Sequence, residues 1–565
     1  MHNLQSVGFY DGIRIGKKKI QGRFVIPSGV RCAHASAIEQ YFNIKSVGII
    51  TTKSISANPK KGYKEPLYVK YGAQSYINAV GLANPGAEIF KEELSKIKIP
   101  ENKFLLVSIF GSDENDFYKA AQILAPYADG FELNMSCPHS DGYGLQIGND
   151  INLVCKITKR IAQGFDLPVF VKISAIIPNV AELAGAAIEN GAAGITAINT
   201  VGPSVEYVGG VPVLSNVVGG MSGEAIRPLG LKALCDIRKV IGEQPTIIGL
   251  GGIFNSEHVK SYNQAGADFF GIGSALTNLN TREATEYFDS LQQDIITRPN
   301  ADSYALKPVD NMEYQKCFVE KSTALTDILH KIKISGWKDY GIKKDTAGKF
   351  FFIMIPGIGE KPFALFSYDD REIIVKNVGY FTNKLANLSE GDALFIRGPY
   401  GKELPVFKDA VINFVAGGTG ISPVYEIAGK YAGSNKIRFF LGGRIAGDIF
   451  DIGRFEKIGE VNVATEDGSV GLKGYVTDLL KSCEFDQSEE QIFINVGPKV
   501  MIEKSYDIEK TVANQENIWV SIEYQTSCGV GICGKCATGQ GAISCVDGPF
   551  LRVTDALKIE DCKHQ

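Results

Sequence analysis

The sequence lacks several features that would place it in a special class of protein. It has no run of 18 or more apolar residues that would suggest a membrane span. Its first residues have no apolar stretch before the lysines, which argues against a signal peptide. It has no basic tract, and its formal net charge is −4. Nucleic acid is therefore not expected as the main partner.

Paired cysteine spacing is also missing outside one motif near the C-terminus. Seven of the 11 cysteines are scattered along the chain: Cys32, Cys137, Cys155, Cys235, Cys317, Cys483 and Cys562. This usage suits a reducing cytosol better than a disulfide framework, so a cytoplasmic protein is expected. The remaining composition, 44% hydrophobic over 565 residues, is that of a globular protein with three or four domains.

The most specific motif consists of four cysteines separated by glycines. They are spaced Cys528-x4-Cys533-x2-Cys536-x8-Cys545, which is the plant-type pattern for a [2Fe–2S] cluster. The glycines allow sharp turns that point N–H groups at sulfide. Four buried or disulfide-bonded cysteines are the alternative. A cluster would carry one electron at a time, so the rest of the chain should hold an electron donor and an electron acceptor.

The first 300 residues alternate short apolar runs with amphipathic stretches. Eight runs are nearly continuous: 24–29, 47–51, 104–111, 130–138, 168–174, 194–200, 246–253 and 269–276. Strands of this kind with helical crossovers predict a parallel sheet closed into a (β/α)8 barrel, in an α/β protein. Active sites of such barrels lie at the C-terminal ends of the strands. Polar residues and glycines occur there: Ser28, Lys53, Asn134, Cys137, Lys172, Asn199 and Gly251–Gly252.

Three of these features suggest a redox site. Glycine-rich segments 249–253 and 271–275 follow the seventh and eighth runs, where barrels often bind a cofactor phosphate. Cys137 follows the fourth run and would act as a base if its pKa fell toward neutrality, the alternative being a buried structural thiol. Lys172 lies inside an apolar strand, where it needs a partner. An anionic flavin would supply that partner.

The motifs of this half resemble class 1 dihydroorotate dehydrogenase, an FMN-dependent barrel enzyme. They are TTKS (51–54), NAVGLANPG (78–86), NMSCP (134–138), VKIS (171–174), INT (198–200), GGMSGEAIRP (219–228), GLGGI (249–253) and GIGSA (271–275). The resemblance implies oxidation of dihydroorotate to orotate, with Cys137 taking the C5 proton and the C6 hydride passing to FMN. It implies Lys172 beside the flavin N1–C2 carbonyl.

The same resemblance assigns two sets of binding residues. The substrate residues are Lys53, Asn78, Gly81, Leu82, Asn134, His139, Asn199 and Thr200. The FMN residues are Ser28, Gly29, Ser54, Lys172, Gly223, Gly251, Gly252, Gly273 and Ser274. His139 departs from the family, which usually has Asn there. The resulting sequence SCPH resembles the corresponding motif of dihydropyrimidine dehydrogenase, which acts on uracil and thymine. The motif NAVGLANPG instead favours dihydroorotate as the substrate.

The last 260 residues are rich in short strands. Those at 312–320, 328–334, 349–357, 363–367, 372–379 and 393–401 predict a small antiparallel barrel. Segment 411–420 is an apolar strand that runs into glycines, and a helical pattern follows from Ile421. This arrangement suits a nucleotide phosphate. Further strands are expected at 437–444, 461–468, 492–497 and 518–524.

The order of these parts resembles the electron-transfer subunit of class 1B dihydroorotate dehydrogenase, a ferredoxin-reductase-like protein. GYFTNKLANLSEGDALFIRGPYG, VAGGTGISP, NVGPKVM and SIEYQTSCGVGICGKC carry the resemblance. It implies FAD on the small barrel, with Lys361, Pro362, Phe363, Ala364, Gly379 and Thr382. It implies NAD(H) on the glycine-rich domain, with Gly417, Gly418, Thr419, Gly420, Gly497 and Pro498. Thr382 is equally well explained as a helix cap.

The whole sequence is therefore interpreted as a fusion of two subunits that are usually separate. The expected parts are an FMN barrel (1–300), a linker (301–310), an FAD barrel (311–405), an NAD domain (406–515) and a cluster domain (516–565). Electrons would pass from dihydroorotate through FMN, the cluster and FAD to NAD+, in pyrimidine biosynthesis. Family habit suggests a homodimer through the first barrel.

Two alternatives and two details stay open. The first alternative function is that of a reductase of uracil or thymine. The second is that of an electron-transfer protein whose barrel only docks a partner. Arg444 is either a residue that binds the 2′-phosphate and so selects NADPH, or an ordinary surface arginine. Asp467 is a further candidate for the nicotinamide side.

Overall fold

The computed structural model describes residues 12–135, 148–297, 306, 309–337, 347–522 and 525–557. The chain forms two compact units. Unit 1 comprises Met1–Asp310 together with Val530–Lys535, and unit 2 comprises Asn311–Gly529 together with Cys536–Gln565. The finer division into five parts stays a prediction.

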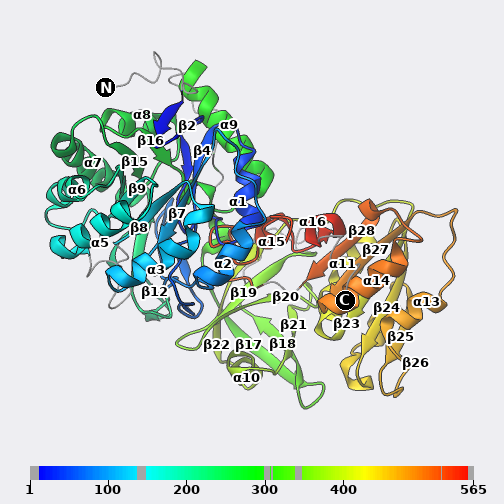
Figure 1. Ribbon diagram of the computed structural model, residues 1–565. Helices are drawn as coiled ribbons and strands as arrows, with labels where there is room; N and C mark the ends of the chain where they lie inside the picture. Colours follow the sequence, from blue (N-terminus) through cyan, green and yellow to red (C-terminus); the bar gives the residue numbers. More distant parts are fainter. Residues whose placement is uncertain are drawn as a thin grey trace. The chain divides into compact units, whose positions relative to one another are not determined.

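Unit 1 is built on a closed barrel of eight parallel strands in the order β10-β15-β16-β3-β4-β7-β8-β9 (Figure 1). The strands are β3 (Phe24–Ile26), β4 (Val47–Thr51), β7 (Phe104–Ile109), β8 (Gly130–Asn134), β9 (Val169–Ile173), β10 (Gly194–Ala197), β15 (Thr246–Leu250) and β16 (Phe269–Gly271). Each one lies inside one of the eight apolar runs. The predicted (β/α)8 barrel is therefore confirmed.

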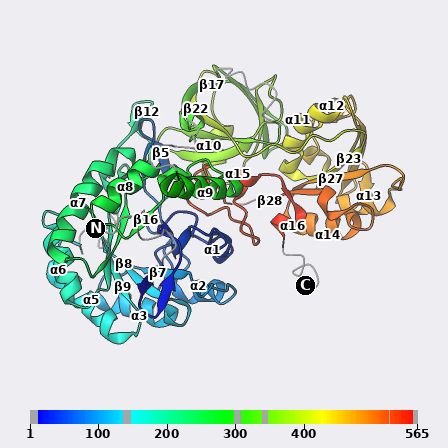
Figure 2. The same ribbon diagram turned by 90° about the horizontal axis from the view of Figure 1, so that it is seen from above.

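Helices surround this barrel, as Figure 2 shows in a view from above. They are α1 (Ala35–Phe42), α2 (Ala87–Leu94), α3 (Glu114–Leu124), α5 (Ile151–Gly164), α6 (Val180–Glu189), α7 (Arg227–Ile241), α8 (Ser256–Gln264) and α9 (Thr281–Thr297). Because the strands are covered on their outer side and filled on their inner side, nearly every strand residue is buried. A hairpin of β1 (Ile13–Ile15) and β2 (Lys18–Ile20) adds Ile15 and Ile20 to the barrel core beside Phe104 and Phe170.

Loops of the barrel form two further sheets in unit 1. The larger is antiparallel between its paired strands and has the order β11-β14-β6-β5. Its strands are β5 (Tyr68–Lys70), β6 (Ser75–Asn78), β11 (Val201–Ser204) and β14 (Gly219–Gly223). The smaller pairs β12 (Tyr207–Val208) with β13 (Val211–Pro212). The larger sheet therefore brings Asn78 and Gly220, which are far apart in the sequence, into register.

Unit 2 begins with a six-stranded, barrel-like antiparallel sheet in the order β20-β19-β22-β17-β18-β21. The strands are β17 (Gln315–Ala324), β18 (Leu329–Ser335), β19 (Phe350–Ile355), β20 (Gly359–Ala364), β21 (Glu372–Lys376) and β22 (Ala393–Tyr400). Their alternating buried side chains, such as Phe351, Ile353 and Ile355 of β19, form one core with α10 (Tyr380–Ala386). Each of the six predicted strands overlaps an observed one, but the strand expected at 363–367 lies earlier, at Gly359–Ala364, where it pairs with β19.

An α/β layer follows, with sheet order β26-β25-β24-β23-β27-β28-β29. The strands are β23 (Val411–Gly417), β24 (Lys436–Gly443), β25 (Glu460–Thr465), β26 (Leu472–Lys473), β27 (Gln491–Gly497), β28 (Ile518–Ile522) and β29 (Leu551–Arg552). All neighbours pair in parallel except β28 and β29. The helices are α11 (Ile421–Tyr431), α12 (Ile452–Phe455), α13 (Val476–Ser482), α14 (Lys499–Glu509), α15 (Ser544–Asp547) and α16 (Val553–Ala556).

Both faces of this second sheet are covered by helices (Figure 2). Phe414 of β23 packs in one core with α11, whereas Val415, the next residue, packs in another core with α13 and α14. This alternation explains why β23 reads as a continuous apolar run. The predicted strand, glycine turn and helix from 411 onward are confirmed. Among the helices of the described ranges, none is both long and apolar enough to cross a bilayer.

One buried carboxyl in this layer makes stability depend on pH. Glu509 of α14 is fully buried, and Asn495 Nδ2 donates to its Oε2 at 2.9 Å. Burial raises the pKa of Glu509 to about 8. Between the ordinary pKa of a glutamate, about 4.3, and this value, the folded protein holds a proton that the unfolded chain has released. The free energy of unfolding therefore falls as pH rises through that window.

We expect Glu509→Gln to remove this pH-dependent decrease in the free energy of unfolding, because glutamine stays neutral and keeps an acceptor for Asn495. At about pH 8.5 the variant should be more stable than the parent by on the order of a few kcal/mol, and near pH 5 the two should be similar. Thermal or urea unfolding at the two pH values measures the effect. Glu503→Gln on the same helix is the matched control, because Glu503 is only half-buried. An unchanged pH slope in the Glu509 variant would contradict this account.

Candidate active site

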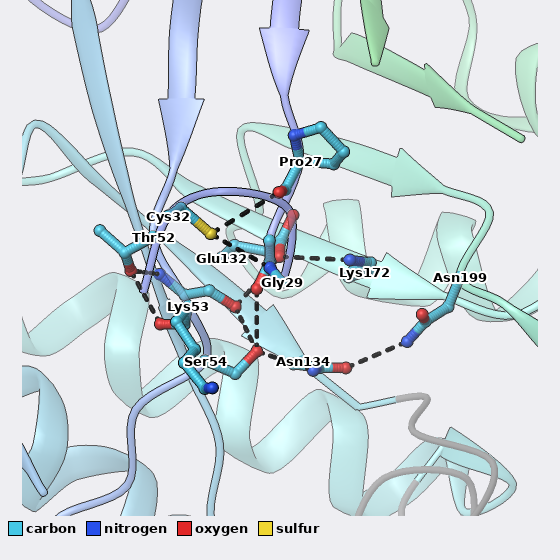
Figure 3. A network of polar contacts seen from close by, with 12 residues as sticks. Pro27, Gly29, Cys32, Thr52, Lys53, Ser54, Glu132, Asn134, Lys172 and Asn199 are labelled. Carbon is cyan, nitrogen blue, oxygen red and sulfur yellow. Dashed lines mark hydrogen bonds and ion pairs between the residues drawn. The ribbon is translucent and has the colours of Figure 1, made fainter. Parts of the chain in front are cut away.

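A chain of three serine hydroxyls lies at the C-terminal end of the barrel. Its central member, Ser54, is labelled in Figure 3. Ser28 Oγ lies 3.1 Å from Ser54 Oγ, which lies 2.9 Å from Ser108 Oγ. Ser108 Oγ donates to Glu132 Oε1 at 3.0 Å. Each hydroxyl has one proton and a carboxylate only accepts. The carboxylate therefore orients the whole chain, with Ser28 donating to Ser54 and Ser54 donating to Ser108.

The same carboxylate forms a buried ion pair with Lys172. Lys172 Nζ lies 3.8 Å from Glu132 Oε1, and the two residues are 5% and 1% exposed. They come from the neighbouring strands β9 and β8, on which Glu132 and Asn134 alternate with the outward-facing Phe131 and Leu133. Lys172 therefore already has a counter-charge within the protein, the carboxylate of Glu132. Its contact with an anionic flavin stays a prediction.

Two asparagines extend the network toward the next strand. Asn134 Nδ2 donates to Ser54 Oγ at 2.9 Å, and Asn199 Nδ2 donates to Asn134 Oδ1 at 3.3 Å. The Oδ1 atom of Asn199 in turn accepts from the amide of Thr200 at 2.8 Å. The structure thus joins Ser28, Ser54, Asn134, Lys172 and Asn199 in one polar network. All but Ser28 are labelled in Figure 3. All five were predicted site residues.

The turn after β3 is stabilised by a hydrogen bond to the thiol of Cys32. The Gly29 amide donates to Cys32 Sγ at 3.2 Å, and the Lys53 amide donates to Cys32 O at 3.2 Å. Burial raises the pKa of the Cys32 thiol to about 11, so it is neutral and serves as a packing and hydrogen-bonding group. Gly29 has a φ of +84° with open space beside it. The turn therefore presents Ser28 and Gly29 to the barrel mouth.

Lys53 lies beside a segment from the far end of the sequence, Val530–Lys535, which belongs to unit 1. Within that unit, the Arg31 amide donates to Ile532 O and the Asn278 amide donates to Val530 O, both at 2.8 Å. Burial lowers the pKa of the Lys53 ammonium, and Cys533 opposes this shift electrostatically. One cysteine of the predicted cluster motif therefore lies within electrostatic range of a predicted substrate residue.

The glycine-rich turns of the barrel pack closely against neighbouring segments of unit 1. A Cβ on Gly252 would come within 2.6 Å of Gly223 O, and one on Gly273 would lie 3.6 Å from Pro27 and Val30. Gly251 and Gly252 have φ values of +119° and +67°, which favour glycine. Within the described part of unit 1, the amides of Gly252, Gly273 and Ser274 donate no hydrogen bond. These groups are available to an anion.

The remaining predicted substrate residues occupy the sheet beside the mouth or lie outside the described residues. Asn78 ends β6, and its Nδ2 donates to Gly220 O at 3.3 Å. Gly81 and Leu82 follow in left-handed conformations, with φ values of 72° and 55°. A Cβ on Gly81 would lie 2.7 Å from the Tyr63 ring, which explains the glycine. Cys137 and His139 lie outside the described residues, so their assignments stay predictions.

Sequence reasoning missed three members of this site: Ser108, Glu132 and Cys32. Glu132 carried the clearest signal, because a glutamate inside the apolar run GFELN needs a partner for the same reason as Lys172 does. Ser108, inside FLLVSIFG, and Cys32 carried none. A buried serine or thiol is ordinary in a strand or loop, and its partners are known only once the fold is known.

In unit 2 the predicted FAD segments adjoin each other. Phe363 of β20 and Phe381 of α10 have ring centroids 6.4 Å apart. Thr382 Oγ1 accepts from the Gly379 amide at 3.0 Å and from the Val378 amide at 3.1 Å. Thr382 is therefore a helix cap, as one of the two alternatives held. Tyr380, in the same turn, is 64% exposed, and Lys384 Nζ lies over its ring at 6.0 Å from the centroid.

The predicted NAD segments also meet. A Cβ on Gly420 would lie 2.3 Å from Val496 O and 3.2 Å from the Gly497 amide, so the turn after β23 packs against the end of β27. Pro498 immediately precedes α14. Asp467 Oδ1 accepts from the Ser469 amide at 2.9 Å and closes a turn after β25. Arg444 is paired with Asp448, at 3.8 Å, and its side chain is largely exposed.

Three of the four motif cysteines gather in unit 2. Cys528, Cys536 and Cys545 are each 1% exposed. Hydrogen bonds to Cys528 and Cys536, together with burial, raise the pKa of the Cys545 thiol well above its ordinary value. In the described ranges, no three His, Cys, Asp or Glu side chains are arranged to hold a single metal ion. A two-iron cluster is a different case, because it divides four thiolates between two irons.

Comparison with known proteins identifies the family of the first unit. The family model described as "Dihydroorotate dehydrogenase" matches residues 13–295. The catalytic subunit of dihydroorotate dehydrogenase B (NAD(+)) from Methanocaldococcus jannaschii is 36% identical over 256 residues, 44% of this chain and 82% of that protein. The chain belongs to the dihydroorotate dehydrogenase family. With this family it is an oxidoreductase acting on CH–CH bonds, which confirms the prediction of an enzyme against that of a docking barrel.

Other relatives extend the match over most of the family domain. The catalytic subunits of the same name from Pyrococcus horikoshii and Thermoplasma acidophilum are 37% and 34% identical. They align over 46% and 48% of this chain and over 84% and 94% of their own lengths. A structure of an NADH-dependent reduced ferredoxin-NADP oxidoreductase is 26% identical and covers 43% of this chain and 90% of its own, with a TM-score of 0.38. A TM-score this low supports no conclusion about fold or function.

Proposed function

We propose that this member of the dihydroorotate dehydrogenase family oxidises dihydroorotate to orotate on FMN and passes the electrons through a [2Fe–2S] cluster and FAD to NAD+. It would thus combine both class 1B subunits in one chain and serve pyrimidine biosynthesis. The observation that carries the proposal is the polar network of Ser54, Asn134, Lys172 and Asn199 at the barrel mouth. It lies in a unit whose family acts on this substrate.

The residues of the barrel mouth fit FMN. A phosphate suits the available amides of Gly252, Gly273 and Ser274, because backbone N–H groups at a turn bind anions. Lys172 is buried at the end of β9 and would place a cation beside the flavin N1–C2 carbonyl. FMN bound there would accept the hydride from C6 of the substrate. Glu132 would hold the Lys172 side chain in place for this contact.

The other residues would hold the substrate and move its proton. Lys53 suits the anionic pyrimidine, and Asn134 and Asn199 supply amides for its ring. Cys137, three residues after β8, would take the proton from C5. Gly81 and Leu82 would receive the carboxylate. Uracil has no carboxylate, so the dihydroorotate assignment predicts that this group is needed for binding.

The cysteine loop fits a cluster, since Cys528, Cys536 and Cys545 are buried together in unit 2 and positive φ values at Gly529, Gly531 and Gly534 allow its turns. Cys533 belongs to the unit of the barrel and interacts electrostatically with Lys53. Electron transfer from FMN to the cluster is part of the proposal. In unit 2, the turns at Gly379 and Gly420 support FAD and NAD(H) sites. A homodimer through the barrel remains part of the proposal.

A reductase of uracil or thymine is the second candidate, and His139 favours it. The discriminating experiment offers orotate and uracil side by side, each with NADH and with NADPH, and follows oxidation of the nicotinamide under anaerobic conditions. The proposal predicts turnover with orotate and NADH. Turnover with uracil alone would replace it with the second candidate. Preference for NADPH would assign Arg444 to the 2′-phosphate.

Glu132→Gln should raise the reduction potential of the bound FMN. The substitution removes the carboxylate 3.8 Å from Lys172 Nζ, so the full charge of the ammonium would act on the reduced, anionic flavin. A potentiometric titration followed by flavin absorbance measures the shift. Ser108→Ala is the control, because it removes the hydrogen bond to Glu132 and leaves the charge. A lowered or unchanged potential would contradict the prediction.

A further inference from the structure

Unit 2 contains a second buried ion pair, which the proposed function does not use. Arg397 of β22 and Glu360 of β20 are each 1% exposed. Arg397 Nε donates to Glu360 Oε2 at 2.7 Å and Nη2 donates to Oε1 at 2.5 Å. This is the two-pronged geometry of a strong arginine–carboxylate pair. Removing two charges from water is costly, so a pair this deeply buried calls for a functional explanation.

Aromatic rings enclose the guanidinium. Its Cζ lies 4.1 Å from the centroid of the Phe352 ring, 5.2 Å from that of Tyr400 and 5.7 Å from that of Tyr314. The Tyr314 hydroxyl also donates to Glu360. The rings exclude water and favour a cation over their faces. The charge of Arg397 is therefore only weakly screened on the side that the carboxylate does not cover.

That uncovered side faces the cysteine loop. Arg397 Nη1 donates to Cys528 O at 3.1 Å and to the Tyr400 hydroxyl at 2.7 Å. The next residue, Gly529, has a φ of +81°. A Cβ there would lie 2.8 Å from Phe352 and 3.1 Å from Tyr400. The Cys528–Gly529 peptide thus packs against these aromatic rings and accepts a hydrogen bond from the guanidinium.

We propose that the Arg397–Glu360 pair positions the first cysteine of the [2Fe–2S] loop and sets the reduction potential of the cluster. The inference rests on the proposed function, which supplies the cluster. Nε and Nη2 face the carboxylate, and Nη1 faces Cys528. The pair is therefore a dipole with its positive end toward the cluster ligand. Reduction adds a negative charge to the cluster, and this end of the dipole stabilises it.

Two variants separate this electrostatic role from a structural one, because they shift the potential in opposite directions. Glu360→Gln leaves the cation uncompensated, so the cluster should become easier to reduce and its potential should rise. The double variant Arg397→Met and Glu360→Met removes the dipole, so the potential should fall. Apolar residues of similar volume often replace a buried ion pair without loss of stability. The double variant therefore tests the inference even if the single variant does not fold.

The experiment uses the full-length protein purified anaerobically. It measures iron and acid-labile sulfide per chain, the EPR spectrum of the reduced cluster and its midpoint potential. The control removes the same charges from the exposed pair Lys333–Glu320 of the same sheet, and it should leave the potential unchanged. Shifts of opposite sign support the inference. Unchanged potentials in both variants, or shifts of the same sign, overturn it.

The same measurement distinguishes failure of the inference from failure of the proposed function. A parent protein without iron and sulfide would overturn both. A parent protein with a normal cluster, together with variants whose EPR spectrum and potential match it, would overturn the inference alone. Loss of iron only in the double variant, with an unchanged potential for the cluster that remains, would show that the pair only positions Cys528 and would overturn its role in setting the potential.

Discussion

Replacing Cys137 by alanine should lower the rate of dihydroorotate oxidation by roughly 10²- to 10⁴-fold, the usual contribution of a positioned acid–base group. The expected cause is the loss of the group that takes the C5 proton, while the network around Lys172 and Asn134 still holds the flavin and the pyrimidine. Reduction of an artificial dye by NADH uses only the other cofactors and should be unchanged. Steady-state rates of the two reactions, measured on one preparation, check this.

Cys235→Ala is the matched control for this substitution. Cys235 is exposed on α7 of the same unit, so this control shows whether loss of a surface thiol from the barrel unit affects the rate. Dihydroorotate oxidation and dye reduction should both match those of the parent. The proposed division between the two halves of the chain would be wrong if the Cys137 variant lost both activities together. An unchanged rate of dihydroorotate oxidation would exclude Cys137 as the base.

Replacing Cys545 by serine should separate the two half-reactions. Cys545 lies buried against Cys528 and Cys536, so its loss leaves the cluster without one of its four thiolates. Iron per chain should fall to near zero, and dihydroorotate-dependent reduction of NAD+ should fall by at least about 10²-fold, since no other carrier is proposed between the flavins. Anaerobic bleaching of FMN by dihydroorotate should persist.

Cys483→Ser provides the control within unit 2. Cys483 is half-buried, lies outside the motif, and burial raises the pKa of its thiol. This variant should retain iron and the full reaction. Retention of NAD+ reduction in an iron-free Cys545 variant would mean that electrons pass between the flavins directly. The cluster would then have no place in the route.

The barrel was predictable because parallel strands buried on both faces read as unbroken apolar runs, and each of the eight runs contains a strand. Unit 2 was predictable for a related reason: the runs at β19 and β23 end at glycines that mark turns. Local chemistry was less certain. The sequence allowed two roles for Thr382, and only the observed hydrogen bonds to Val378 and Gly379 show that it caps α10.

Partners that are distant in the sequence were the hardest to predict. The need of Lys172 for a counter-charge was clear, but the identity of that partner follows from the register in which β8 lies beside β9. Arg397 carried the same signal as Lys172, a cation within an apolar strand. Its partner Glu360 is 37 residues away and directly precedes the segment 361–364, which was interpreted as a flavin motif. A single sequence shows that a buried charge needs a partner but does not identify it.

The most direct test of the proposed electron-transfer route follows the redox state of the cluster itself. The protein is mixed anaerobically with dihydroorotate in the absence of NAD+, and samples frozen over time are examined by EPR. The account predicts that flavin bleaching is followed by the signal of a reduced [2Fe–2S] cluster, and that added NAD+ removes this signal as NADH forms. Bleached flavin and NADH formation with a cluster that stays oxidised throughout would contradict the account.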